Sequence, residues 1–250
     1  FNPRKLITQQ LWLYFLGQSL MLVFRAVVLQ EDFAESGGVL AALLLPWRHM
    51  WYLYALLFWH LTLPLLCLLR DRLGLVGSCL GMALVVAAGL AGGLIDWPFM
   101  LVRVFAFFPF YAFGVLFRPQ LDTLAAFAAQ NRAARLLPAA GLAVGYGLYF
   151  IRVFCSETIL DNSAELFHDV SYAGGDRPEY RIVFYLVGIA TTAALVAAFS
   201  SGHRLTGLGR RTLAIYLLHL PILALLVQLQ LFEPLRLGKG RCILGVVHCF

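Results

Sequence analysis

The chain has 250 residues, of which 61% are hydrophobic and only 13% are charged, and its formal net charge is +6. A soluble domain carries about 25% charged residues, so this composition cannot cover a water-exposed surface and indicates an integral membrane protein. The excess of positive charge falls mostly in short loops, where membrane topology accounts for it, and therefore predicts no nucleic-acid partner.

Apolar runs separated by Gly, Pro and charged residues predict an all-α fold, a polytopic transmembrane helix bundle. About 20 apolar residues cross the roughly 30 Å hydrocarbon layer of a bilayer. On this criterion we expect about seven spans, at residues 6–29, 51–69, 74–95, 99–117, 135–151, 181–199 and 212–231.

The segments between these runs alternate in net charge. Residues 1–5 carry +2, and the following loops carry −2, +1, −1, +2, −3 and +3 up to residues 200–211. Because positive loops stay in the cytoplasm, we expect a multi-pass protein of the cell (inner or plasma) membrane with a cytoplasmic N-terminus. The basic tail beyond the last span is the one segment that does not fit this alternation.

The two ends of the sequence are abrupt. Residues 1–5 resemble a cytoplasmic loop that follows an earlier helix, and residues 242–250 begin an apolar run of half the length that a span needs. We therefore expect a transmembrane domain over residues 1–232, a tail over residues 233–250 that is an incomplete further span, and a chain cut at both ends. Five cysteines without a CxxC pair predict neither a disulfide framework nor a zinc site.

Four ionisable residues fall inside the predicted spans, where such groups are functional candidates by default: Arg25, His60, Arg103 and His219. The stems of both arginines are long enough to snorkel to the headgroups, which would explain them without function. His60 could simply hydrogen-bond a neighbouring helix. His219 is the sharpest candidate, because Tyr216 shares its helix face and histidine exchanges protons near neutral pH.

Other features have weaker chemical meaning. Gly77 and Gly81 form a GxxxG pair, and with Gly89 and Gly92 they predict a closely packed helix. The acidic residues and the histidine of loop 152–181 could hold a divalent cation, line a sugar site or form a solvated surface; we predict no metal site. No Walker, GxSxG or HExxH motif occurs.

Three stretches resemble one family in order and spacing: Trp51-Tyr52-Leu53 behind Pro46, Phe107-Phe108-Pro109-Phe110 with Gly114 and Arg118, and Arg211 to Pro221 (RTLAIYLLHLP). They are similar to motifs of the acyltransferase-3 membrane proteins, in the branch related to fucose 4-O-acetylases. The resemblance covers roughly residues 1–232 and implies a bundle of ten helices in the full family fold.

The resemblance also implies an activity, the transfer of an acetyl group from cytoplasmic acetyl-CoA to a hydroxyl of a surface sugar or glycan precursor. Acetyl-CoA is then the acyl donor, the glycan and the bilayer are the partners, and no bound cofactor is expected. His219 and Arg103 are the expected catalytic residues. The expected substrate-binding residues are Trp51, Tyr216, His60, Arg210 and Arg211.

One departure from the family matters. Its first helix carries an arginine followed about eleven residues later by a histidine, and the present sequence has no such pair. We therefore expect that missing histidine to be the general base, His219 to line the donor pocket or orient the thioester, and Arg103 to stabilise charge nearer the outer side. This fragment could then be inactive by itself. Two other interpretations stay open, a transporter of a small molecule or lipid-linked sugar and a non-catalytic truncated bundle.

Overall fold

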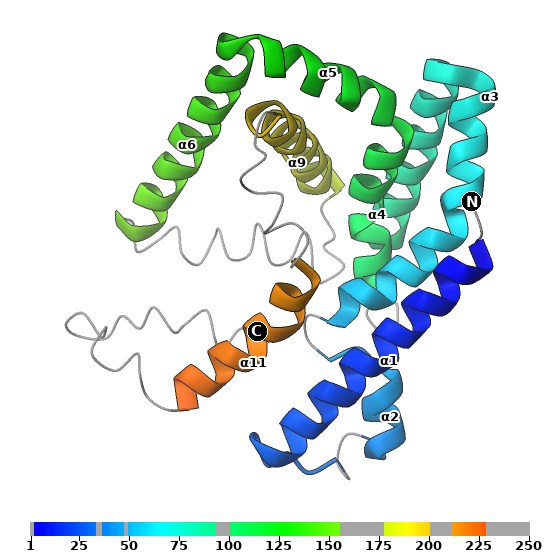
Figure 1. Cartoon of the computed structure of the whole chain (residues 1–250), viewed down its shortest axis with the longest axis vertical. Helices are drawn as coiled ribbons and strands as arrows, with labels where there is room; N and C mark the ends of the chain where they lie inside the picture. Colours follow the sequence, from blue (N-terminus) through cyan, green and yellow to red (C-terminus); the bar gives the residue numbers. More distant parts are fainter. Residues whose placement is uncertain are drawn as a thin grey trace. The chain divides into compact units, whose positions relative to one another are not determined.

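The computed structural model describes residues 3–33, 37–47, 50–93, 101–155, 178–200 and 212–228, and no strand occurs in these segments (Figure 1). The helices are α1 (Pro3–Val27), α2 (Gly38–Leu44), α3 (Trp51–Gly93), α4 (Leu101–Leu116), α5 (Arg118–Gln130), α6 (Arg132–Cys155), α9 (Pro178–Ala198) and α11 (Thr212–Gln228).

The chain divides into two compact units. Unit 1 comprises residues 1–56 and 204–250, and its described part contains α1, α2, the first residues of α3 and α11. Unit 2 comprises residues 57–203 and contains the remainder of α3 together with α4, α5, α6 and α9.

Three described helices are long and apolar enough to cross a membrane, with spans at Ile7–Val27, Trp51–Gly92 and Arg181–Ala198. A fourth span results if α4 and α5, which meet at a bend of 67°, count as one broken crossing. The protein is thus all-helical with three or four candidate spans in its described part, and the number seven stays a prediction.

Helix α3 is interrupted where the sequence predicts a boundary between two spans. Gly74 has φ 57° and ψ −132°, which lies outside helical geometry and is open to glycine because it has no Cβ. The helix therefore consists of two arms, residues 51–73 and residues 75–93. The hydroxyl oxygen of Ser78 lies 3.1 Å from the carbonyl oxygen of Gly74, in the first turn of the second arm.

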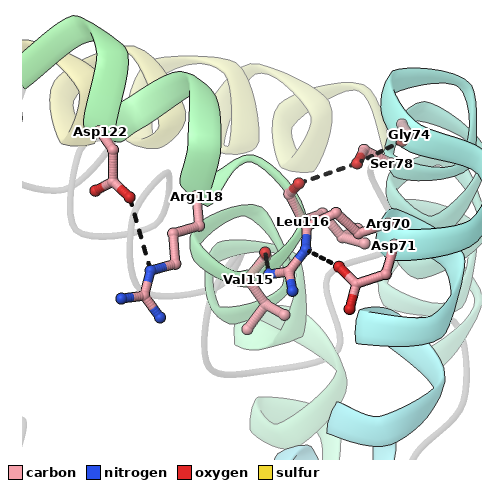
Figure 2. Close-up of polar contacts among 8 residues, drawn as sticks. All are labelled: Arg70, Asp71, Gly74, Ser78, Val115, Leu116, Arg118 and Asp122. Carbon is pink, nitrogen blue, oxygen red and sulfur yellow. Dashed lines mark hydrogen bonds and ion pairs between the residues drawn. The ribbon is translucent and has the colours of Figure 1, made fainter.

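The carbonyl end of α4 is held by side chains of α3 (Figure 2). Arg70 Nη1 donates to the carbonyl of Val115 at 3.0 Å, and Ser78 Oγ donates to the carbonyl of Leu116 at 2.9 Å. The last carbonyls of a helix have no partner within the helix, and a cation there also opposes the helix dipole. These two contacts fix the C-terminus of α4 against α3.

Helix α5 occupies a segment that the charge pattern predicts as a loop, and that prediction was wrong. Its alanine-rich sequence favours a helix, and Pro119 stands in its first turn, where a missing N–H costs nothing. Asn131 then caps α6 by accepting from the N–H groups of Ala133 and Ala134 at 3.0 and 3.3 Å. Helix α9 lies within the angle between α5 and α6 (Figure 1).

Unit 1 has its own core, which consists of the buried side chains of Tyr14, Met21, Met50 and Leu53. The short helix α2 lies within the loop predicted for residues 30–50, because the apolar run VLAALL there folds as a helical turn.

The glycines of the third predicted span pack closely, as the sequence predicts. Added methyl groups at Gly81, Gly89 and Gly92 would meet Leu116, Tyr185 and Phe105 respectively at 2.5 to 3.3 Å. The absence of side chains at these positions lets α3 approach α4 and α9.

Candidate functional site

The start of α3 and helix α11 bring several polar aromatic side chains together in unit 1. The rings of Tyr52 and Tyr216 meet edge to face at 5.6 Å, and those of Trp51 and Tyr52 meet at 6.0 Å. Tyr216 also packs on the unit 1 core, and its ring lies 6.0 Å from that of His219. The structure therefore gathers three of the predicted site residues, Trp51, Tyr216 and His219, around Tyr52. We call these four residues the α3–α11 cluster.

The contacts of His219 indicate which of its two ring nitrogens carries the proton of the neutral ring. Its Nδ1 lies 2.7 Å from the carbonyl oxygen of Tyr216 and 3.2 Å from that of Ile215. Because carbonyl oxygens only accept hydrogen bonds, we assign the proton of the neutral ring to Nδ1. Nε2 is then the basic nitrogen, which can accept a proton or a hydrogen bond from a bound hydroxyl.

Tyr216 is held at the N-terminus of α3. Tyr52 is the second residue of α3, and its ring meets that of Tyr216 edge to face at 5.6 Å. This contact joins α11 to the first turn of α3.

Two polar residues of α1 position the chain that leads into α3. The Tyr14 hydroxyl donates to the carbonyl of Leu44 at 2.8 Å, and the Gln18 amide donates to the carbonyl of Leu45. The Gln18 side-chain oxygen in turn accepts from the backbone N–H of Trp47 at 3.5 Å. These bonds hold residues 44–47, which lead into α3, against the middle of α1.

Arg25, for which the sequence offers snorkelling as an explanation without function, has partners within the folded chain. Its side chain is 10% exposed, and its Nε forms an ion pair with a Glu31 carboxylate oxygen at 2.7 Å. The guanidinium also lies 4.9 Å from the ring centre of Phe33 and 5.6 Å from that of Trp47. Glu31 and Phe33 from the turn after α1 and Trp47 from the segment after α2 surround the guanidinium, so the charge of Arg25 is satisfied within unit 1.

Unit 2 places His60 beside an aromatic pair. The His60 ring meets the Tyr111 ring edge to face at 5.9 Å, and the Trp59 ring lies 5.4 Å from the same tyrosine. The indole N–H of Trp59 donates to the carbonyl of Val104 at 2.9 Å, which joins α3 to α4. His60 is thus half-buried between these helices, and its hydrogen bond to a neighbouring helix stays a prediction.

Arg103 lies in the first turn of α4 and is half-buried, whereas its neighbours in the sequence, Val102 and Val104, are buried. Its predicted catalytic role stays a prediction. Arg210 and Arg211 lie outside the described residues, as does the acidic stretch of loop 152–181. Within the described segments, no group of three or more His, Cys, Asp and Glu side chains could hold a metal ion.

The sequence interpretation missed several residues that build these sites. Tyr14 and Gln18 lie within the first apolar run and were not considered, although an amide at membrane depth is itself a signal because it needs a hydrogen-bond partner. Tyr52 was noted only as part of a motif. Arg181 was treated as the boundary of a span, yet it is 2% exposed in the folded chain.

Comparison with known proteins identifies the chain at the family level. None of the curated proteins and none of the solved structures compared with it matches. A family model described as an acyltransferase domain matches residues 8–238, which is nearly the whole chain. The match includes every described helix from residue 8 onward, and with it the α3–α11 cluster and the His60 region. The chain belongs to the acyltransferase-3 family and is a membrane acyltransferase.

Proposed function

We propose that this protein transfers an acetyl group from cytoplasmic acetyl-CoA to a hydroxyl group of a surface sugar or glycan precursor. The observation that carries the proposal is the coincidence of the family match with a histidine whose Nδ1 is bound to backbone carbonyls. The fucose 4-O-acetylase-related motifs favour a sugar as acceptor.

The reaction requires little from the enzyme beyond proton transfer and charge stabilisation, because a thioester is already an activated acyl donor. The acceptor oxygen attacks the carbonyl carbon of the thioester and loses its proton. The carbon–sulfur bond then breaks, and the CoA thiolate leaves and takes up a proton. A basic nitrogen near the thioester and a donor to the developing oxyanion are sufficient for these steps.

His219 suits the donor side of this reaction. In the assigned tautomer, Nε2 can accept a hydrogen bond or a proton, while the carbonyls of Ile215 and Tyr216 hold the ring in place. The aromatic rings of Trp51, Tyr52 and Tyr216 would line the acetyl and pantetheine part of the donor. Arg210 and Arg211 would attract its phosphates, since arginine pairs strongly with phosphate.

Arg103 and His60 are the predicted site residues that belong to unit 2. We assign Arg103 the role of stabilising negative charge nearer the outer side, because a guanidinium remains charged at any pH that a protein meets. His60 would contribute a hydrogen bond to the sugar beside Tyr111.

The test is the amount of acetylated surface glycan in cells that produce the whole natural protein. We expect His219→Ala to lower acetylation by about 100-fold, the size of effect that misplacing a reacting group has. Leu218→Ala is the matched control, because Leu218 is the neighbouring residue of α11 and its side chain is 44% exposed. Protein amounts in the membrane are compared by immunoblot.

A second variant separates chemistry from structure. His219→Asn can replace the Nδ1–H bond to the carbonyls but has no counterpart of Nε2. If Nε2 contacts substrate, His219→Asn is as inactive as His219→Ala, whereas full activity of the asparagine variant would remove His219 from the site. Movement of solute without loss of the acetyl group from CoA would favour the transporter interpretation instead.

A further inference from the structure

Arg181 stands out in unit 2 as a buried cation with little to neutralise it. It lies in the first turn of α9, and the residue is 2% exposed. Its Nη1 donates to the carbonyl oxygen of Gly89 at 2.9 Å. Its Nη2 is buried and has no hydrogen-bond partner, and the side chain forms no ion pair with any residue that the structure describes.

Tyr185 adds a second unused donor on the same face of α9. It follows Arg181 by four residues, one helical turn, and is also 2% exposed. Its hydroxyl is buried without a partner among the described residues. Both side chains converge on Gly89, since a methyl group added there would lie 2.5 Å from the Tyr185 hydroxyl oxygen.

The carbonyl of Gly89 does not balance the charge of Arg181. Gly89 lies near the C-terminus of α3, where the helix dipole corresponds to about half a negative charge. A guanidinium has five donors and stays protonated, and an uncompensated buried charge costs several kcal/mol. The N–H groups of Nη2, together with the hydroxyl of Tyr185, remain for another group.

A positive charge with free N–H groups beside a hydroxyl is complementary to an oxyanion. We propose that Arg181 and Tyr185 form a binding site for an anionic oxygen group, a carboxylate or a phosphate, between α3 and α9. Arg181 supplies the charge and paired N–H groups, Tyr185 donates a further hydrogen bond, and Gly89 leaves the room for both. The group comes either from a soluble anion or from the phosphate of a phospholipid. This site does not depend on the proposed acetyl transfer.

The test uses the whole chain, purified in detergent and freed of lipid. Thermal unfolding is followed with inorganic phosphate or acetate against sodium chloride of equal ionic strength. We expect the oxyanions to raise the unfolding midpoint of the natural sequence, and Arg181→Gln to abolish this shift. Tyr185→Phe should reduce the shift, and Arg181→Lys should keep part of it because the charge remains.

Arg118→Gln is the control, because it also removes one positive charge from unit 2 but acts on a side chain that is 75% exposed. This variant should respond to phosphate like the natural sequence. If Arg181→Gln does not fold, as judged by size-exclusion chromatography, the decision falls to Tyr185→Phe.

A lipid source is examined by native mass spectrometry before lipid is removed. Phospholipid retained by the natural sequence and lost in the Arg181 or Tyr185 variant would identify the oxyanion as a headgroup phosphate. The proposal is overturned if neither phosphate, acetate nor retained phospholipid is detected. It is equally overturned if the Arg181 and Tyr185 variants bind these anions as well as Arg118→Gln does.

Discussion

Arg25 in unit 1 and Arg181 in unit 2 are both buried arginines, yet their surroundings differ. Arg25 has a carboxylate at 2.7 Å and two aromatic rings within 6 Å, all supplied by residues 31–47, which lie between α1 and α3. Arg181 has one backbone carbonyl at 2.9 Å. A buried charge that finds its partners in its own chain is explained by folding, whereas one that lacks them indicates a ligand.

The largest loss of stability should come from breaking the ion pair between Arg25 and Glu31. Arg25→Gln should lower the free energy of unfolding by about 2–3 kcal/mol, at the low end of buried ion pairs because Glu31 is 36% exposed. Arg181→Gln in lipid-free, phosphate-free protein should change it by less than about 1 kcal/mol, since it removes an uncompensated charge. Denaturant titration in mixed micelles measures both, and equal losses would refute the contrast between the two arginines.

Substitution of Gly89 tests the packing around Arg181 and Tyr185. Gly89→Ala should cost about 1–3 kcal/mol, because its methyl group would lie 2.5 Å from the Tyr185 hydroxyl and 3.1 Å from the Phe105 carbonyl oxygen. Gly114→Ala in α4 is the control. No atom lies within 4 Å of its added methyl group, and a helical Gly→Ala change stabilises by up to about 1 kcal/mol. The same denaturant titration applies, and similar effects at the two positions would contradict the close packing of α3 and α9.

The smallest change in the free energy of unfolding should come from breaking the ion pair between Arg70 and Asp71, which is more exposed than that of Arg25. Arg70 donates to the carbonyl of Val115 and also pairs with Asp71 at 2.8 Å (Figure 2). The Asp71 side chain is 61% exposed, so water screens the pair. Asp71→Asn should therefore change the free energy of unfolding by less than about 0.5 kcal/mol. A loss above 1 kcal/mol would show that this pair behaves like that of Arg25.

The arginines also show how much of the fold could be predicted. Apolar length located the described helices of the candidate spans, and Gly74 was correctly placed at a break. The partner of Arg25 could not be predicted, because it depends on how the chain turns after α1. Helices α2 and α5 were missed for a related reason, since they are short and lie where polar or Gly-containing sequence predicts loops.

The candidate site was predicted in part. The relation of Tyr216 to His219 follows from helical spacing, and the structure confirms that their rings are neighbours. The contact between Tyr216 and Tyr52 joins residues far apart in the sequence, and helical periodicity carries no information about such pairs. Arg181 escaped notice because burial, which makes it unusual, is a property of the folded chain.

The central claim, acetyl transfer by this membrane acyltransferase, is tested most directly by following the acetyl group itself. Membrane vesicles from cells that produce the whole natural protein are incubated with acetyl-labelled CoA, and the label in the glycan fraction is counted. We expect label to enter the glycan in inverted vesicles, whose cytoplasmic face is exposed to CoA, and His219→Ala to abolish the transfer. Label that stays on CoA while the glycan remains unacetylated in these vesicles would contradict the account.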